Sequence, residues 1–136
     1  GEVVYLLEER SPRGVSLITD VGVRLPAAAT ASGRAMLAQL PAAELKALYG
    51  VVGHGSYREW LVPITEAKHR GWGSESEEVS PGQESLAVAV VDHMGRPAAA
   101  LAVTFRVGSL DKNRVNEVIE QLQSRAAMLE SALFGR

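Results

Sequence analysis

Two apolar segments separated by a short loop constrain the fold of this chain more than any other feature. Ser85–Asp92 and Pro97–Phe105 are rich in Val, Leu and Ala, and His93-Met94-Gly95-Arg96 lies between them. A short loop containing Gly between two apolar runs is typical of a β-hairpin. The sequence therefore predicts a long antiparallel hairpin near the C-terminal third of the chain.

The side chains of this hairpin sort into two unlike faces. If Asp92 lies opposite Pro97, alternation along each strand places small residues on one face. That face holds the facing pairs Ser85 and Thr104, Ala87 and Ala102, and Ala89 and Ala100. The other face holds Leu86, Val88, Val90, Ala99, Leu101 and Val103. The bulky face requires a covering helix, whereas the floor of small side chains, with two hydroxyls at one end, leaves room for a ligand.

The remaining segments predict strands at the start of the chain and helices on either side of the hairpin. Strands are expected at Val3–Glu8, Val15–Thr19 and Trp72–Ser74. Thr30 is expected to cap a helix that begins at Ala31, and Pro41 to restart a short helix that ends at Gly50. Together with the last helix, these elements indicate an α+β domain with a largely antiparallel sheet flanked by helices.

Two further helices carry clear end signals. Ser56, with Glu59 three residues on, matches a capping box, and Pro63 predicts a kink or a delayed start in the helix that follows. Ser109 or Asp111 is expected to cap the last helix. Its apolar stripe recurs every three or four residues and suits the bulky face of the hairpin: Val115, Ile119, Leu122, Ala126, Leu129 and Leu133.

Composition excludes several classes of function. The 136 residues are enough for one domain, and we interpret 1–136 as a single unit. No apolar run approaches the length of a membrane span, and cysteine is absent, which fits a reducing cytoplasm. The net charge of −2 does not supply the basic face that nucleic-acid binding needs. The chain begins at Gly1 without Met and runs straight into a strand, so we expect it to be a piece of a longer protein.

Few residues combine into a pattern typical of catalysis or of metal binding. His54, His69 and His93 lie in unrelated segments without the spacing of a metal site, so surface positions are expected and no cofactor is predicted. Glu77 and Glu78 read as a solvated acidic loop, whereas Glu75 follows a short strand and could turn inward. The small residues at 30–33 leave backbone amides exposed at a helix start, where the helix dipole favours an anion, although close packing explains them equally well.

Two separated stretches resemble the IclR (isocitrate lyase regulator) family of bacterial transcription factors. The first runs from Val21-Gly22-Val23-Arg24-Leu25-Pro26 to Thr30-Ala31-Ser32-Gly33-Arg34-Ala35-Met36-Leu37-Ala38. The second comprises Arg70-Gly71-Trp72, Glu77-Glu78, Pro81-Gly82, Leu86-Ala87 and Val90-Val91-Asp92. The resemblance covers essentially the whole chain, and it implies a GAF-like effector-binding domain.

The resemblance also implies partners. Members of this family are dimers or tetramers that sense small molecules, often organic acids, and a separate N-terminal winged helix-turn-helix binds operator DNA. We therefore expect a small-molecule effector, a homodimer or homotetramer, and operator DNA bound only through a domain outside this chain. No membrane partner is expected.

The effector contacts implied by the resemblance fall on eight residues. Leu17 and Leu25 would form an apolar wall, and Ala31 and Ser32 would offer backbone donors. The acidic strand and the hairpin would contribute side chains, with Glu75 at the rim: Glu75, Ser85, Ala102 and Thr104. Relatives that take very small acids tend to carry Asp, Cys, Ser and Ser at these last four positions, so a larger or less polar acid becomes the alternative here.

Two other functions remain open on the sequence alone. One is an enzyme on a similar fold, with Glu75 as general base beside Ser85. The other is a dimerisation module with a vestigial pocket. We favour a sensor, because the predicted pocket offers hydrogen-bond donors but no activated nucleophile, metal or acid–base pair. A helix-turn-helix encoded upstream would distinguish a sensor from an enzyme.

Overall fold

The computed structural model describes residues 1–6 and 22–135. The predicted strand Val15–Thr19 and the end of the predicted strand Val3–Glu8 lie outside the described residues. The described strands are β1 (Glu2–Val4), β2 (Arg24–Pro26), β3 (Gly73–Ser76), β4 (Gln83–Val91) and β5 (Pro97–Arg106). The helices are η1 (Ala27–Ala29), α1 (Ala31–Leu37), α2 (Ala42–Val52), α3 (Tyr57–Arg70) and α4 (Lys112–Phe134).

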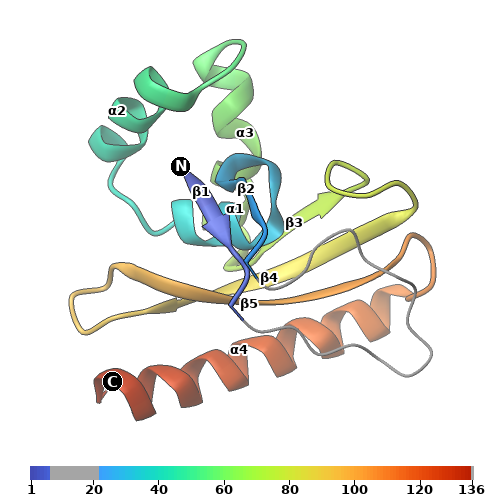
Figure 1. Cartoon of the computed structure of the whole chain (residues 1–136). Coiled ribbons are helices and arrows are strands. Elements are labelled where there is room, and N and C mark those ends of the chain that lie inside the picture. The colour runs from blue at the N-terminus through green and yellow to red at the C-terminus, as the bar shows by residue number, and fades with distance from the viewer. Residues whose placement is uncertain (7–21, 136) are drawn as a thin grey trace.

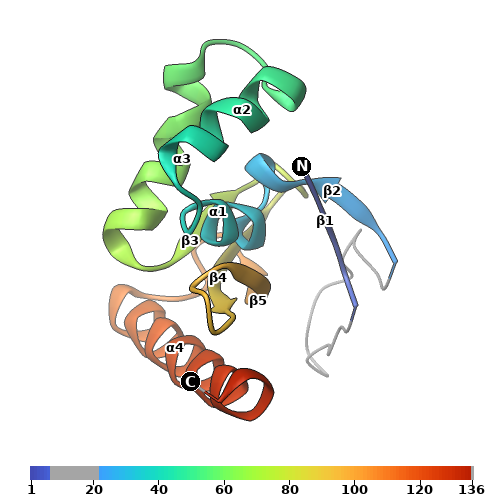
Figure 2. The same ribbon diagram turned by 90° about the vertical axis from the view of Figure 1, so that its left-hand side faces the viewer.

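The described strands form two antiparallel sheets. β3, β4 and β5 pair in that order, and β1 pairs with β2 in a separate ribbon. In Figure 1 α4 lies along one face of the three-stranded sheet, and the other helices lie on the opposite side. Figure 2, turned by 90°, shows the β1–β2 ribbon standing beside α1. This arrangement is the predicted α+β fold with antiparallel sheets flanked by helices.

The hairpin has the predicted faces. Ser85 pairs with Thr104, Ala87 with Ala102 and Ala89 with Ala100, as expected from alternation. The end of the hairpin differs, because Val91 rather than Asp92 lies opposite Pro97. The Asp92 carboxylate accepts hydrogen bonds from the amides of the turn, and the Asp92 amide donates to the Arg96 carbonyl at 2.8 Å. Asp92 therefore belongs to the turn, and β5 gains one extra residue as a bulge.

Each face of the hairpin packs on a different helix. The bulky face buries Leu86, Val88 and Val90 against Ile119, Leu122 and Ala126 of α4. On the small face Ala87 and Ala89 pack against Ala31 and Ala35 of α1. The predicted floor is thus partly occupied by a helix, and only the end at Ser85 and Thr104 is left for a cavity.

Helix ends follow the predicted signals with two exceptions. Thr30, Ser56 and Asp111 cap α1, α3 and α4 through their side chains. α2 continues past the predicted stop at Gly50 to Val52, since a single Gly weakens a helix without ending it. α3 begins at Tyr57 and runs through Pro63, so the predicted delayed start is wrong. Within the described residues, we found no helix that is both long enough and apolar enough to span a membrane.

Candidate functional site

A small cavity lies where the start of α1 meets the end of the small-residue floor. Its volume is about 30 Å³, which is enough for only about two or three water molecules. Its walls come from the continuation of β1, α1, β3, the acidic loop and the hairpin: Tyr5, Thr30, Ala31, Ser32, Glu75, Val79, Ser80, Gln83, Ser85, Ala102 and Thr104.

Six of the eight residues expected to contact an effector line this one cavity. They come from three separate parts of the chain: Ala31, Ser32, Glu75, Ser85, Ala102 and Thr104. Leu25 pairs with Val3 in the β1–β2 ribbon and is not among the described lining residues. Leu17 lies outside the described residues. That any of the eight binds an effector stays a prediction.

The start of α1 presents two unused backbone donors toward the cavity. The Thr30 hydroxyl oxygen accepts from the Gly33 amide at 2.9 Å, and the Thr30 carbonyl accepts from the Arg34 amide at 3.0 Å. Within the described part of the chain, the amides of Ala31 and Ser32 donate no hydrogen bond. The first amides of a helix have no intrahelical acceptor, so these two are available to a ligand.

The floor of the cavity carries two hydroxyls that bond to each other. Ser85 and Thr104 face one another in the β4–β5 register, and their side-chain oxygens lie 2.8 Å apart. One hydroxyl donates in this bond, so the other keeps its hydrogen for a further acceptor. Ala102, two residues before Thr104 on the same face, adds only a methyl group.

Glu75 lies inside the cavity wall rather than at its rim. Only 5% of the residue is exposed, and it lies opposite Ser85 in the β3–β4 register. Its Oε2 accepts from the Glu78 amide at 3.2 Å, and this is the one hydrogen bond of its carboxylate among the described residues. The hypothesis that Glu75 turns inward is confirmed, and its expected place at the rim is wrong, because Glu75 shares with Gly73 the face of β3 that lies against α1.

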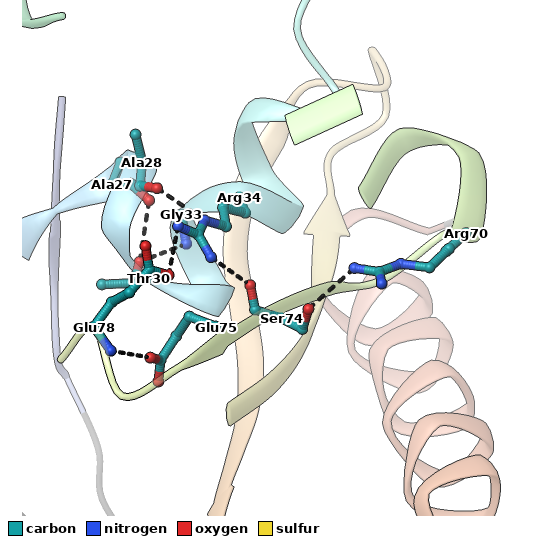
Figure 3. Close-up of polar contacts among 9 residues, drawn as sticks. All are labelled: Ala27, Ala28, Thr30, Gly33, Arg34, Arg70, Ser74, Glu75 and Glu78. Carbon is teal, nitrogen blue, oxygen red and sulfur yellow. Dashed lines mark hydrogen bonds and ion pairs between the residues drawn. The ribbon is translucent and has the colours of Figure 1, made fainter. Parts of the chain in front are cut away.

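A buried arginine behind the cavity holds its parts together (Figure 3). Arg34, 7% exposed, donates from Nε to the Ala28 carbonyl and from Nη1 to the Ser74 carbonyl, both at 2.8 Å. Its Nη2 lies 2.7 Å from a Glu78 carboxylate oxygen. Arg34 thereby joins η1, α1, β3 and the acidic loop, although the sequence identified it only as part of a motif.

Several lining residues were missed by sequence reasoning. Gln83 lies two residues before Ser85, so strand alternation, extended two positions back, would have placed it on the same face. Ser80 and Val79 come from the loop, which closes on itself where the Glu77 amide donates to the Gln83 carbonyl at 2.8 Å. Nothing in the local pattern predicts this closure. Tyr5 lies in a predicted strand without any signal of its own.

In the part of the chain that the structure describes, the histidines and the acidic residues do not converge on a metal site. His54, His69 and His93 are each exposed, as expected. Among residues 1–6 and 22–135, no group of three or more His, Cys, Asp or Glu side chains is placed to hold a metal ion.

The fold and the cavity together define a GAF-like α+β domain with a small recess between a helix start and a sheet. The chain belongs to the IclR family, since the family profile described as "Bacterial transcriptional regulator IclR C-terminal" matches residues 1–130. It is therefore an IclR C-terminal domain, of the kind found in transcriptional regulators.

Known proteins agree with this assignment. The HTH-type transcriptional regulator XynR of Escherichia coli is 30% identical over 140 residues, covering 97% of this chain and 56% of XynR. The chain thus spans about half the length of that curated relative. The Thermotoga maritima IclR crystal structure superposes with a TM-score of 0.89 at 22% identity, covering 97% of this chain and 57% of that one.

Some of the structural neighbours contain a ligand. An IclR homolog from Microbacterium hydrocarbonoxydans, complexed with 4-hydroxybenzoate, superposes with a TM-score of 0.73 at 19% identity. The match covers 90% of this chain and 52% of that one. At this identity the likeness shows a common fold.

Proposed function

We propose that residues 1–136 form the effector-sensing domain of a transcription regulator, with an organic acid as effector. The main support for this proposal is that six of the expected contact residues, from distant segments of the chain, line the same cavity. The whole protein would bind operator DNA through a further domain, as the names of its helix-turn-helix relatives suggest. That role places it in the cytoplasm with the chromosome.

In this proposal the acid group of the effector accepts hydrogen bonds from the amides of Ala31 and Ser32. Its other end lies on the floor formed by Ser85, Ala102 and Thr104. A helix start favours an anion through both its free amides and its dipole. At about 30 Å³ the cavity is smaller than an aromatic acid, so such an effector requires the walls to move apart. Leu17 and Leu25 remain candidates for an apolar wall in that widened state.

Substitutions at the two ends of the cavity test the proposal. Native mass spectrometry of the purified domain would identify a co-purified ligand, and calorimetry would then measure its affinity. Thr104→Val keeps the shape and removes a hydroxyl, so we expect a loss of about 1 kcal/mol, or about 1.5–3 kcal/mol where the bond is to a charged group. Ala31→Pro removes an amide donor and should weaken binding further.

The control for these substitutions is Thr65→Val on α3, an exposed threonine outside the cavity. It should leave affinity unchanged. If folded Thr104→Val and Ala31→Pro domains bind the identified ligand as tightly as the parent does, the ligand lies elsewhere and the assignment of the cavity is wrong.

An enzymatic role receives less support from the same geometry. A serine nucleophile needs a hydrogen bond to its general base. The Ser85 hydroxyl bonds to Thr104, and the Glu75 carboxylate bonds to the Glu78 amide instead. We therefore propose a sensor rather than a hydrolase, and the absence of turnover on an ester panel by a domain that binds the acid would agree.

Self-association is the second part of the proposal. The last turns of α4 expose large apolar side chains, among them Met128 and Leu133, the latter 64% exposed. Such a surface is commonly an interface. Sedimentation should show dimers or tetramers at micromolar concentration, and a monomer at high micromolar concentration would contradict this. The isolated chain, with its net charge of −2, should give no gel shift with DNA at moderate salt.

A further inference from the structure

The cavity contains a buried carboxylate as well as an anion-favouring helix start. Glu75 is 5% exposed, lines the cavity, and takes one donor from the described residues, the Glu78 amide at 3.2 Å. A carboxylate can accept about four hydrogen bonds, and its burial is costly unless they are formed. The Oε1 oxygen of Glu75 thus has no donor among the described residues, and the residue lines the space that a ligand would fill.

Among the described residues, the one charged side chain that lines the cavity is acidic. Glu75, Glu77 and Glu78 lie within one short segment, and among the described residues the cation paired with this segment is Arg34, 2.7 Å from Glu78. Arg34 is not itself among the lining residues. A ligand with two carboxylates would place one of them against Glu75, where the two like charges repel at short range.

The walls of the cavity therefore offer hydrogen-bond donors at one place and a hydrogen-bond acceptor at another. Donors stand at the amides of Ala31 and Ser32, and an acceptor stands at Glu75. The hydroxyl pair of Ser85 and Thr104 can donate or accept, because one hydrogen is not used in their mutual bond and the oxygens keep lone pairs. A ligand that satisfies both places carries one acid group and one hydrogen-bond donor.

We propose that the effector is a monocarboxylic acid bearing a hydroxyl or amino group, and that Glu75 accepts a hydrogen bond from that group. This inference rests on the proposed sensor function and narrows its effector class. Glu75 acts here as a specificity-determining residue, because it strengthens the binding of an acid that carries a hydrogen-bond donor and weakens the binding of an acid that carries a second carboxylate.

Matched sets of small acids test this inference. The first set is propionate, lactate and alanine, which differ only in hydrogen, hydroxyl or ammonium at one carbon. The second is benzoate and 4-hydroxybenzoate, and succinate serves as the dicarboxylate. Calorimetry on the parent chain should show a donor-bearing acid binding about ten- to a hundredfold more tightly than its matched plain acid, because the bond is to a charged acceptor. The comparison of lactate with alanine distinguishes hydroxyl from ammonium.

Variants at Glu75 then locate the cause. Glu75→Gln keeps the shape and removes the charge, so the preference for the donor should shrink and succinate should gain affinity. Glu77→Gln is the matched control, since that exposed carboxylate accepts from the Gly82 amide at 2.9 Å and does not line the cavity. It should leave the preference unchanged. Circular dichroism checks folding, and Glu75→Asp, which draws the charge back by one methylene, replaces a Gln variant that does not fold.

The outcomes distinguish failure of this inference from failure of the proposed function. Plain and donor-bearing acids binding the parent equally would overturn this inference while leaving the sensor function intact. A donor preference that Glu75→Gln and Glu77→Gln both preserve would also overturn it. If no acid in either set binds the parent and the ligand that co-purifies with the domain is not an acid, the proposed function fails and this inference fails with it.

Discussion

Replacing Arg34 by Met should be the most damaging single change to the framework of the cavity. Two of its bonds reach the backbone carbonyls of Ala28 and Ser74 at 2.8 Å, and hydrogen bonds to a charged group contribute about 1.5–3 kcal/mol each. The ion pair with Glu78 adds less, because half of the Glu78 side chain is exposed to water. After partial relaxation we expect Arg34→Met to lower the free energy of unfolding by about 3–5 kcal/mol.

Thermal and urea denaturation measure this loss. For a chain of this size it corresponds to a fall in Tm of about 10–18 °C. Arg34→Lys keeps the charge but offers a single donor group, so it should recover only part of the stability. Arg96→Met is the matched control, because Arg96 also forms a two-bond ion pair, with Glu44, but on an exposed surface. If Arg34→Met and Arg96→Met lower Tm equally, burial and bracing do not explain the role of Arg34.

Four further substitutions test other positions. Gly50 lies in α2 with open space where a Cβ would stand, so Gly50→Ala should raise the free energy of unfolding by about 0.5–1 kcal/mol. A Cβ on Gly73 would instead lie 2.4 Å from a carbonyl oxygen of α1, so Gly73→Ala should lower Tm and loosen α1. Urea titrations measure both changes. Hydrogen bonds within its turn, first that from the Arg96 amide, hold the pKa of Asp92 below its ordinary value. A lowered carboxyl pKa gives stability at neutral pH that is lost as pH falls below about 4, so Asp92→Asn should flatten the acid limb of Tm against pH. Ala102→Ser adds a hydroxyl to the floor and should shift preference from benzoate toward lactate in calorimetry; an unchanged ratio would contradict this.

The hairpin could be predicted from sequence because its pattern and its packing obey the same rule. Alternation put Leu86 and Ala87 on opposite faces, and each face found the partner its side-chain size requires. The caps at Thr30 and Ser56 were equally local, since the acceptor and the amide lie three residues apart.

The cavity was predictable only in part, because its closure depends on contacts between distant segments. Family resemblance supplied residues from α1, β3 and the hairpin, but the burial of Glu75 depends on the packing of β3 against α1 and on the Glu78 amide, which donates to its carboxylate. The position of Arg34 depends on Ser74, forty residues away. No local pattern of charge or hydropathy contains that information, which is why a buried arginine could not be recognised within a short stretch of small residues.

The place of the cavity follows from the length of α1. A helix of seven residues spans about 10 Å, whereas the nine residues of β4 span about 30 Å. Ala31 and Ala35, one turn apart, cover Ala87 and Ala89, and the floor near Ser85 extends beyond them. Because the first turn of α1 is also the wall that offers free amides, any displacement of this helix changes the cavity's volume and its donors together. Contacts that position α1, above all Arg34 and the close approach at Gly73, should therefore influence effector affinity without touching the effector.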